Sequence, residues 1–224
     1  MCQRFSIAAE LPEVQDYFQI DRVMTYYKVR YNINPTQSTP IVLQQNGERI
    51  LDEFRWGFIP YWGKDAVNAD LRNVHGNPSY RKIVDKQRCV IPCSGFYYWR
   101  KEGKKSYPVR VVLKNQGMFG LAGLYEIWRD AHGEPLRTYT LVMTEANPLI
   151  EEFESRMPAM LSPEDIPQWL DEGTSSLDAL HPILRPHSAD EMHAYAVTPM
   201  IDVYGHDTDE CIQEMDLKRA WVKR

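Results

Sequence analysis

The sequence has few cysteines and no long apolar run, and each shortage excludes a class of protein. Its four cysteines are too few and too widely spaced for a disulfide framework. No apolar run approaches the roughly 18 residues that a membrane-spanning helix needs, and no basic segment followed by an apolar core stands at the N-terminus. We therefore expect a cytoplasmic protein that does not bind membranes.

Linkers, repeats and metal-binding patterns are also missing. No Pro-rich or Gly/Ser-rich stretch divides the chain, so we predict one domain over residues 1–201, followed by a loosely ordered tail over 202–224. Cys89 and Cys93 lie in an apolar stretch without the second cysteine pair or close histidine pair of a zinc site, so buried thiols are the better interpretation. We expect a monomer with no metal and no organic cofactor.

The charge balance is mildly acidic. Twenty-six Lys and Arg stand against 31 Asp and Glu, which gives a formal net charge of -5. This balance argues against a protein that coats nucleic acid without regard to sequence, because such proteins use a strong positive field to displace counterions. It leaves room for a local basic groove.

Short apolar and aromatic runs bounded by turn residues fill the first two thirds of the chain, a pattern typical of strands. The predicted strands are 40–44, 52–59, 89–92, 95–100, 107–113, 118–128 and 138–144. The predicted helices are 11–18, 147–153, 163–172, 176–184 and 189–194. Turn signals between neighbouring strands make the pairs antiparallel. We predict an α+β domain, an antiparallel sheet or barrel with peripheral helices.

The second residue carries the most reactive pattern in the chain. A small residue after Met1 normally permits removal of that methionine, which leaves Cys2 with a free α-amine beside its thiol. The amine has a pKa of about 7.7–8.0 and the thiol one of about 8.5, so both are partly deprotonated near neutral pH. Such a pair captures an aldehyde as a Schiff base and closes it into a thiazolidine ring. Because many chains begin Met-Cys by chance, the position alone does not establish this chemistry.

A series of short motifs resembles the SRAP family, the SOS-response-associated abasic-site processing proteins, in order and over most of the chain. The motifs are Met1-Cys2-Gln3-Arg4-Phe5, Tyr31-Asn32-Ile33-Asn34-Pro35-Thr36, Arg55-Trp56-Gly57-Phe58-Ile59-Pro60-Tyr61-Trp62, Asn68-Ala69, Asn77-Pro78-Ser79-Tyr80-Arg81, Arg88-Cys89-Val90-Ile91-Pro92, Gly95-Phe96-Tyr97-Tyr98-Trp99, Ala122-Gly123-Leu124-Tyr125-Glu126 and Arg156-Met157-Pro158-Ala159-Met160-Leu161. Each is weak alone, and together they indicate family membership.

The resemblance implies a compact β-rich fold and release of Met1 by self-processing or an aminopeptidase. It also implies that Cys2 bonds to the ring-opened aldehyde of an abasic site in single-stranded DNA, which shields the lesion from strand cleavage. Four positions carry this chemistry in the family: the cysteine, an Asn, a Glu and a His. The first two are present as Cys2 and Asn68, whereas Tyr98 stands at the Glu position and Glu154 at the His position.

These replacements leave two interpretations of the site open. Ring opening of the abasic sugar and Schiff-base formation both need proton transfer, which is worth about 10²- to 10⁴-fold in rate. In the first interpretation Tyr98 donates a hydrogen bond, and Glu154 acts as acid or base provided that it is buried. In the second, Tyr98 is a core aromatic, Glu154 is a solvated acid, and the covalent chemistry is lost.

Two further departures change the surroundings of the nucleophile. The stretch Asn68-Ala69-Asp70-Leu71-Arg72 reverses the charge order of the family's Asn-Ala-Arg-x-Glu. An ion pair within the protein survives such a reversal, whereas a phosphate-binding arginine changes its reach. Gln3 replaces a family glycine and places a side chain beside Cys2, where a close approach of backbone and DNA is expected.

Basic residues with interleaved aromatic residues predict a groove for single-stranded DNA, in which phosphates are neutralised and bases stack. The basic segments 81–88 and 100–105 contribute to the predicted groove. The predicted DNA-binding residues are Arg4, Trp56, Trp62, Arg72, Arg81 and Arg88. The alternative is that the lysines occupy solvated turns and the tryptophans occupy the core.

The sequence supports three hypotheses for the function. The first is an abasic-site processing protein of the DNA-damage response that acts on single-stranded DNA through Cys2, with family-type peptidase and lyase activity. The second is a binding module that keeps the fold and the groove without the covalent chemistry. The third is an N-terminal-nucleophile amidohydrolase, in which the α-amine of Cys2 is the base for its own thiol.

Overall fold

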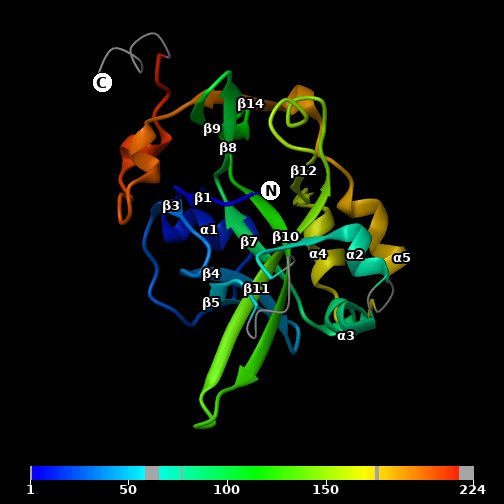
Figure 1. Ribbon diagram of the computed structural model, residues 1–224. Coiled ribbons are helices and arrows are strands. Elements are labelled where there is room, and N and C mark those ends of the chain that lie inside the picture. The colour runs from blue at the N-terminus through cyan, green and yellow to red at the C-terminus, as the bar shows by residue number, and fades with distance from the viewer. Residues whose placement is uncertain (1, 59–65, 77, 175–176, 217–224) are drawn as a thin grey trace.

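The computed structural model describes residues 2–58, 66–76, 78–174 and 177–216, which form two β-sheets with short helices at their edges (Figure 1). In this part of the chain no helix is both long and apolar enough to cross a membrane. The predicted α+β class, with an antiparallel sheet or barrel and peripheral helices, is confirmed.

Five strands form a closed barrel that holds most of the core. They are β4 (Ser38–Gln45), β5 (Glu48–Trp56), β7 (Arg88–Cys93), β10 (Phe119–Arg129) and β11 (Pro135–Glu145). Neighbours pair antiparallel in the order β11-β10-β7-β4-β5, and a parallel contact between β5 and β11, with Trp56 opposite Tyr139, closes the circle. The β10–β11 hairpin continues beyond the barrel and projects from the body of the molecule (Figure 1).

The barrel wall depends on a close approach between β7 and β10. Every residue of β7 is buried, because both of its faces are covered. A Cβ atom added to Gly123 on β10 would lie 2.2 Å from Cδ1 of Ile91 and 2.9 Å from Sγ of Cys89. A side chain at position 123 would therefore collide with the Ile91 and Cys89 side chains, and glycine lets the two strands approach closely.

A second, fully antiparallel sheet packs beside the barrel. Its order is β14 (Met192–Ala196), β9 (Lys105–Leu113), β8 (Gly95–Glu102), β1 (Phe5–Ile7) and β3 (Arg30–Ile33). β7 ends at Cys93 and β8 begins at Gly95, so the chain passes from the barrel into this sheet at Ser94. The pairing of β1 with β8 therefore brings the beginning of the chain to the junction of the two sheets.

Four short strands pair with the barrel strands β5, β10 and β11. β6 (Asn68–Asp70) pairs with β11 in parallel, and β12 (Arg156–Pro158) pairs with it antiparallel. β13 (Met160–Leu161) pairs with β10, and β2 (Arg22–Val23) pairs with β5. β6 and β12 thus both flank residues 141–145 of β11, and this arrangement positions the site described below.

The helices are short and cover the sheet edges. They are α1 (Leu11–Phe18), α2 (Leu71–Gly76), α3 (Pro78–Lys86), α4 (Asp165–Leu170), α5 (Leu177–Leu180) and the 3₁₀ helices η1 (His181–Leu184), η2 (Ala189–Glu191), η3 (Pro199–Asp202) and η4 (Asp209–Ile212). α1 begins with a capping box between Glu10 and Glu13 and ends at Gln19, which adopts φ 54°. Its residues Val14 and Phe18, one turn apart, are buried against the barrel.

Two predicted helices in the last third of the chain are wrong. The predicted helix 147–153 consists of turns, and the predicted helix 189–194 is only η2 followed by strand β14. Ala194 of β14 pairs with Val111, so the free edge of β9 decides the conformation there. Part of the predicted tail 202–224 contacts the sheet. Asp207 Oδ1 accepts hydrogen bonds from the backbone N–H groups of Tyr31 (2.6 Å) and Asn32 (2.8 Å), and the Met215 N–H donates to the Ala196 carbonyl at 2.8 Å.

Candidate active site

Cys2 lies in the interior, between the barrel and the second sheet. Its side chain has no exposed area, and its Sγ donates a hydrogen bond to the Arg4 carbonyl at 3.5 Å. Burial raises the pKa of the Cys2 thiol to about 12. In this state the sulfur is a protonated thiol at neutral pH, so reaction with an aldehyde requires a base beside it.

Asn68 holds the main chain of Cys2. β6 places its side chain so that Nδ2 donates to the Cys2 carbonyl at 2.7 Å. The Asn68 residue is 3% exposed, and among the described residues its Oδ1 has no hydrogen-bond partner. Because a buried acceptor without a donor is unfavourable, this oxygen is available to a group that arrives at Cys2. The structure thus brings together the two family positions that the sequence retains.

Tyr98 is built into the same core. Its hydroxyl donates to the Arg156 carbonyl at 2.8 Å, and its ring stacks on Phe153 at 6.1 Å between centroids. Burial raises the pKa of Tyr98 well above its usual value, with smaller effects from Cys2 and Glu154, both of which lie nearby. Tyr98 is therefore a neutral hydrogen-bond donor whose proton is already committed to the backbone.

Glu154 lies on the outer side of this cluster. Its backbone N–H donates to the Ile150 carbonyl at 2.9 Å and ends the turn 148–153, and the residue is exposed. The acid or base role expected for Glu154 depended on burial of its side chain, and the structure shows the residue exposed. Of the two replaced positions, one has become core and the other surface.

A guanidinium pair shares the carboxylate of Asp70, two residues after Asn68 on β6. Arg72 binds both Asp70 oxygens, with Nη2 to Oδ2 at 2.8 Å and Nε to Oδ1 at 3.1 Å. Arg156 Nε lies 3.0 Å from the same Oδ2. The reversed charge order in this motif is therefore an ion pair within the protein, and the exposed Arg72 side chain still reaches solvent.

Arg4 is held by its neighbours. Its guanidinium donates to Asn32 at 3.2 Å and to Asn34, and it lies 3.2 Å from Asp202 Oδ1. The same group stands over the Trp99 ring at 5.5 Å from the centroid. The ion pair with Asp202 connects η3 to the chain just before β1. A DNA phosphate that binds Arg4 would have to compete with the Asp202 carboxylate.

Two predicted DNA contacts lie in the interior and do not fit that role. Trp56 has no exposed area, and its Nε1 donates to the Val67 carbonyl at 2.9 Å, so its ring offers no face to a base. Arg88 is 6% exposed and donates to the backbone carbonyls of Val84, Asp85, Trp169 and Asp171. Burial lowers the pKa of Arg88. Both residues support the fold.

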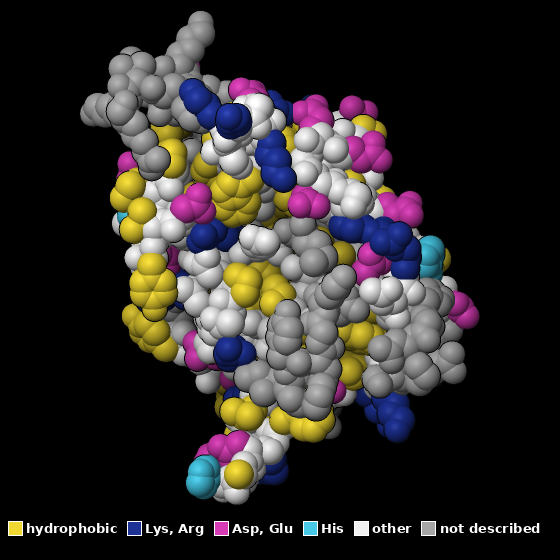
Figure 2. Space-filling view, in the orientation of Figure 1, with side chains coloured by type: hydrophobic (Ala, Val, Ile, Leu, Met, Phe, Trp, Pro, Cys, Tyr) yellow, Lys and Arg dark blue, Asp and Glu magenta, His cyan; other side chains and the backbone are white. Residues whose placement is uncertain are grey.

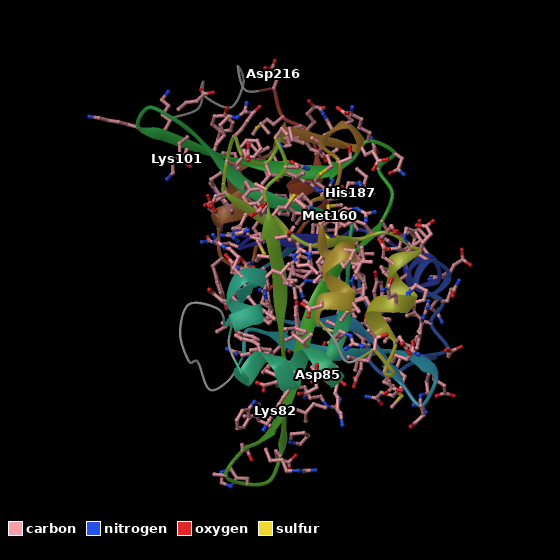
Figure 3. The ribbon with its side chains drawn as sticks, turned by 90° about the vertical axis from the view of Figure 1, so that its right-hand side faces the viewer. Lys82, Asp85, Lys101, Met160, His187 and Asp216 are labelled. Atoms are coloured by element: carbon pink, nitrogen blue, oxygen red, sulfur yellow. The ribbon has the colours of Figure 1, made fainter. Side chains whose placement is uncertain are left out.

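The other predicted contacts are only partly placed. Trp62 lies outside the described residues. Arg81 belongs to α3, but its side chain lies outside the described set. Lys82 and Lys101, from the two basic segments, stand toward opposite ends of the molecule (Figure 3). On the face shown in Figure 2, basic side chains alternate with acidic ones. The segments 81–88 and 100–105 therefore do not form one continuous groove.

Arg156 is the residue of the site that the sequence did not single out. It receives the Tyr98 hydroxyl on its backbone and binds Asp70 with its side chain, which is 8% exposed. Its position in the Arg156-Met157-Pro158 motif was the available signal. Among the described residues, no group of three or more His, Cys, Asp or Glu side chains is placed to hold a metal ion.

Comparison with known proteins agrees with this geometry. The family described as SOS response associated peptidase (SRAP) matches residues 1–203. The chain belongs to the SRAP family. Abasic site processing protein YoqW of Bacillus subtilis is 34% identical over 222 residues, which cover 95% of this chain and 99% of that protein. Abasic site processing protein HMCES of Rattus norvegicus is 27% identical over 237 residues, which cover 85% of this chain and 66% of that protein.

A solved structure has the same fold. A crystal structure of a Bacteroides thetaiotaomicron protein superposes with a TM-score of 0.80 at 25% identity, covering 96% of this chain and 100% of that one. The SRAP match ends at residue 203, whereas the described chain continues to 216 and is tied to β3 through Asp207. In this SRAP protein, then, part of the segment beyond the family match belongs to the folded unit.

Proposed function

We propose that this SRAP protein processes abasic sites in single-stranded DNA through a covalent bond to Cys2, as part of the DNA-damage response. The observation that carries the proposal is the hydrogen bond from Asn68 to the Cys2 carbonyl, with the unpartnered Asn68 Oδ1 buried beside it. Family membership and the abasic-site names of the relatives support it.

The reaction begins once Met1 is removed. The α-amine of Cys2 adds to the aldehyde carbon of the opened sugar, and loss of water gives an imine. Sγ then adds to the same carbon while the thiol proton moves to nitrogen, which yields a thiazolidine and one water in total. The imine nitrogen takes the proton of a thiol whose pKa is raised to about 12, and Asn68 Oδ1 accepts a hydrogen bond from the amine N–H before the imine forms and from the ring N–H afterwards.

The test uses single-stranded DNA with one abasic site and a denaturing gel. Wild-type protein that has lost Met1, as verified by intact mass, is expected to give a shifted band that survives denaturation. Cys2→Ala should give none, while Cys211→Ser, which removes another buried thiol at η4, should behave as the wild type. A wild-type sample without Met1 that forms no band would overturn the covalent proposal.

A second candidate has one observation in its favour. The Tyr98 hydroxyl is committed to the Arg156 carbonyl and Glu154 is exposed, so neither replacement offers the proton transfer of the family site. The second candidate is a DNA-binding module of the SRAP fold without covalent chemistry. A shift in a native gel that disappears in the denaturing gel would select it.

A further inference from the structure

Asp202 lies on a stretch of main chain that a buried amide holds against the second sheet. Asn32 of β3 is 2% exposed, and its Nδ2 donates to the Ile201 carbonyl at 2.9 Å and to the His206 carbonyl at 2.7 Å. The backbone is thus fixed on both sides of Asp202. An anion that approaches this place can therefore displace the Asp202 side chain more easily than the chain that carries it.

The Asp202 carboxylate is the charged partner of Arg4. Its Oδ1 lies 3.2 Å from Arg4 Nη2, and its Oδ2 accepts a hydrogen bond from Trp99 Nε1 at 3.3 Å. The other contacts described for the guanidinium are neutral, namely the side-chain oxygens of Asn32 and Asn34 and the Trp99 ring. The Asp202 side chain is 51% exposed and that of Arg4 only 18%, so the carboxylate is on the solvent side of the pair.

Arg4 is also part of the backbone that fixes the nucleophile. Its carbonyl accepts a hydrogen bond from Cys2 Sγ at 3.5 Å and another from the Tyr97 N–H at 3.0 Å. The guanidinium that Asp202 binds thus belongs to a residue in direct contact with Cys2. A phosphate next to a sugar at Cys2 would therefore approach Arg4 and Asp202 together.

The ion pair between Arg4 and Asp202 is weak enough to be exchanged and close enough to interfere. Pairs with a solvent-exposed partner contribute little, because water and salt screen their charges. A phosphate that approaches Arg4 while the carboxylate stays in place meets a like charge, which is unfavourable. If the carboxylate turns away instead, Arg4 loses one anion as it gains another. In both cases Asp202 reduces what Arg4 contributes to DNA binding.

We propose that Asp202 competes with a backbone phosphate of single-stranded DNA for Arg4, and that this autoinhibitory contact weakens the binding of strands beside Cys2. The identity of the strand rests on the proposed function. The competition rests on the 3.2 Å contact with Arg4 and on the anchored main chain around Asp202.

The test measures binding without the covalent step. A labelled single strand with an abasic-site analogue that has no aldehyde is titrated by fluorescence anisotropy over a range of salt concentrations. Asp202→Asn keeps an oxygen that accepts from Arg4 or Trp99 and removes the negative charge, so it should bind about two- to fivefold tighter than the wild type. Because the Arg4 charge then acts on the phosphate alone, the plot of log affinity against log salt should steepen by up to about 0.7.

A double-mutant cycle locates the effect at Arg4. Arg4→Gln should change the affinity of the wild type by less than about twofold, and it should abolish the gain of Asp202→Asn. Asp202→Ala, which places no amide beside Arg4, should gain as much as Asp202→Asn. Equal affinities of the wild type and both Asp202 variants would overturn the inference, as would a gain that persists in the double variant.

The matched control is Glu48→Gln. Glu48 on β5 pairs with Arg22 at 3.5 Å and its side chain is 55% exposed, so this variant changes the net charge by the same amount at similar exposure. It should leave the affinity and its salt dependence at the wild-type values. A gain in Glu48→Gln equal to that in Asp202→Asn would assign the effect to net charge and overturn the competition at Arg4.

The competition and the proposed function fail in different ways. If the reactive abasic strand gives no covalent band while Asp202→Asn gains affinity through Arg4, the covalent function fails and the competition stands. If the band forms while Asp202→Asn binds as the wild type does, the competition fails and the function stands.

Discussion

The site has two halves, Cys2 with Asn68 and Tyr98 with Glu154, and their side chains make different contacts. Cys2 and Asn68 are joined by a hydrogen bond and leave one acceptor unused, whereas Tyr98 is saturated by packing and by the Arg156 carbonyl, and Glu154 faces solvent. The first half is arranged to hold a nucleophile. Neither Tyr98 nor Glu154 is a buried acid or base with a free proton to give or take, so in the proposed reaction the proton transfer has to come from the α-amine or from water.

The largest effect is expected from the first half. Asn68→Ala removes the donor to the Cys2 carbonyl and the free acceptor, so the covalent reaction at saturating DNA should slow by about tenfold to a hundredfold. Time courses on denaturing gels measure this rate. Asn147→Ala is the matched control, because it removes a buried amide bonded to the His187 carbonyl at 2.7 Å, away from Cys2. Equal rates for Asn68→Ala and wild type would remove Asn68 from the mechanism.

The buried thiol predicts a pH dependence of stability. The pKa of Cys2 is raised to about 12 in the folded state, from an unfolded value near 8.5, so its contribution is complete below pH 8.5 and is lost as the pH rises toward 12. Between pH 7 and 10, wild type should lose about 1 to 2 kcal/mol more than Cys2→Ser. Urea unfolding under reducing conditions measures both. Parallel losses in the two proteins would mean that Cys2 ionises freely in the fold.

A smaller effect should come from the second half. Tyr98→Phe leaves the Arg156 carbonyl without its donor, which should lower the free energy of unfolding by about 1 kcal/mol and change the covalent rate less than about twofold. Tyr97→Phe is a control on the same strand, because its hydroxyl donates to the Tyr31 carbonyl at 2.7 Å. A strong loss of rate in Tyr98→Phe alone would show that its proton takes part in the reaction.

The smallest change is expected at Glu154. Because the residue is exposed, Glu154→Gln should alter the covalent rate by less than about twofold and the stability by less than about 0.5 kcal/mol. Glu152→Gln, which removes an exposed acid paired with Arg100, gives the reference. If Glu154→Gln slows the reaction far more than Glu152→Gln, the second half has kept a proton-transfer role.

The sequence predicted the fold because the strands follow local patterns, and the family resemblance singled out Cys2 and Asn68. Alternating apolar runs and turn residues located the barrel strands, and the structure adds the hydrogen bond that joins Asn68 to Cys2. Side-chain roles that depend on burial were missed. Trp56 and Arg88 are residue types that often contact nucleic acids. Here Trp56 is buried in the core, and Arg88 donates to four backbone carbonyls.

Long-range pairing accounts for the remaining differences. The segment 189–194 has a helical pattern, yet β9 presents an open edge and the second half of the segment becomes part of strand β14. Asp207 looks like a residue of an acidic tail, but the N–H groups of β3 bind it. Neither partner is near in the sequence, so a local pattern does not reveal the contact.

Strand β6 sets the distance between Cys2 and the two arginines, Arg72 and Arg156, that bind Asp70. Alternate residues of a strand point to the same side about 7 Å apart, so Asn68 and Asp70 fix the distance from Cys2 to Arg156. A slip of one residue against β11 would turn both side chains away together. An insertion within β6 would therefore uncouple the whole site in one step, whereas each point substitution removes only one contact.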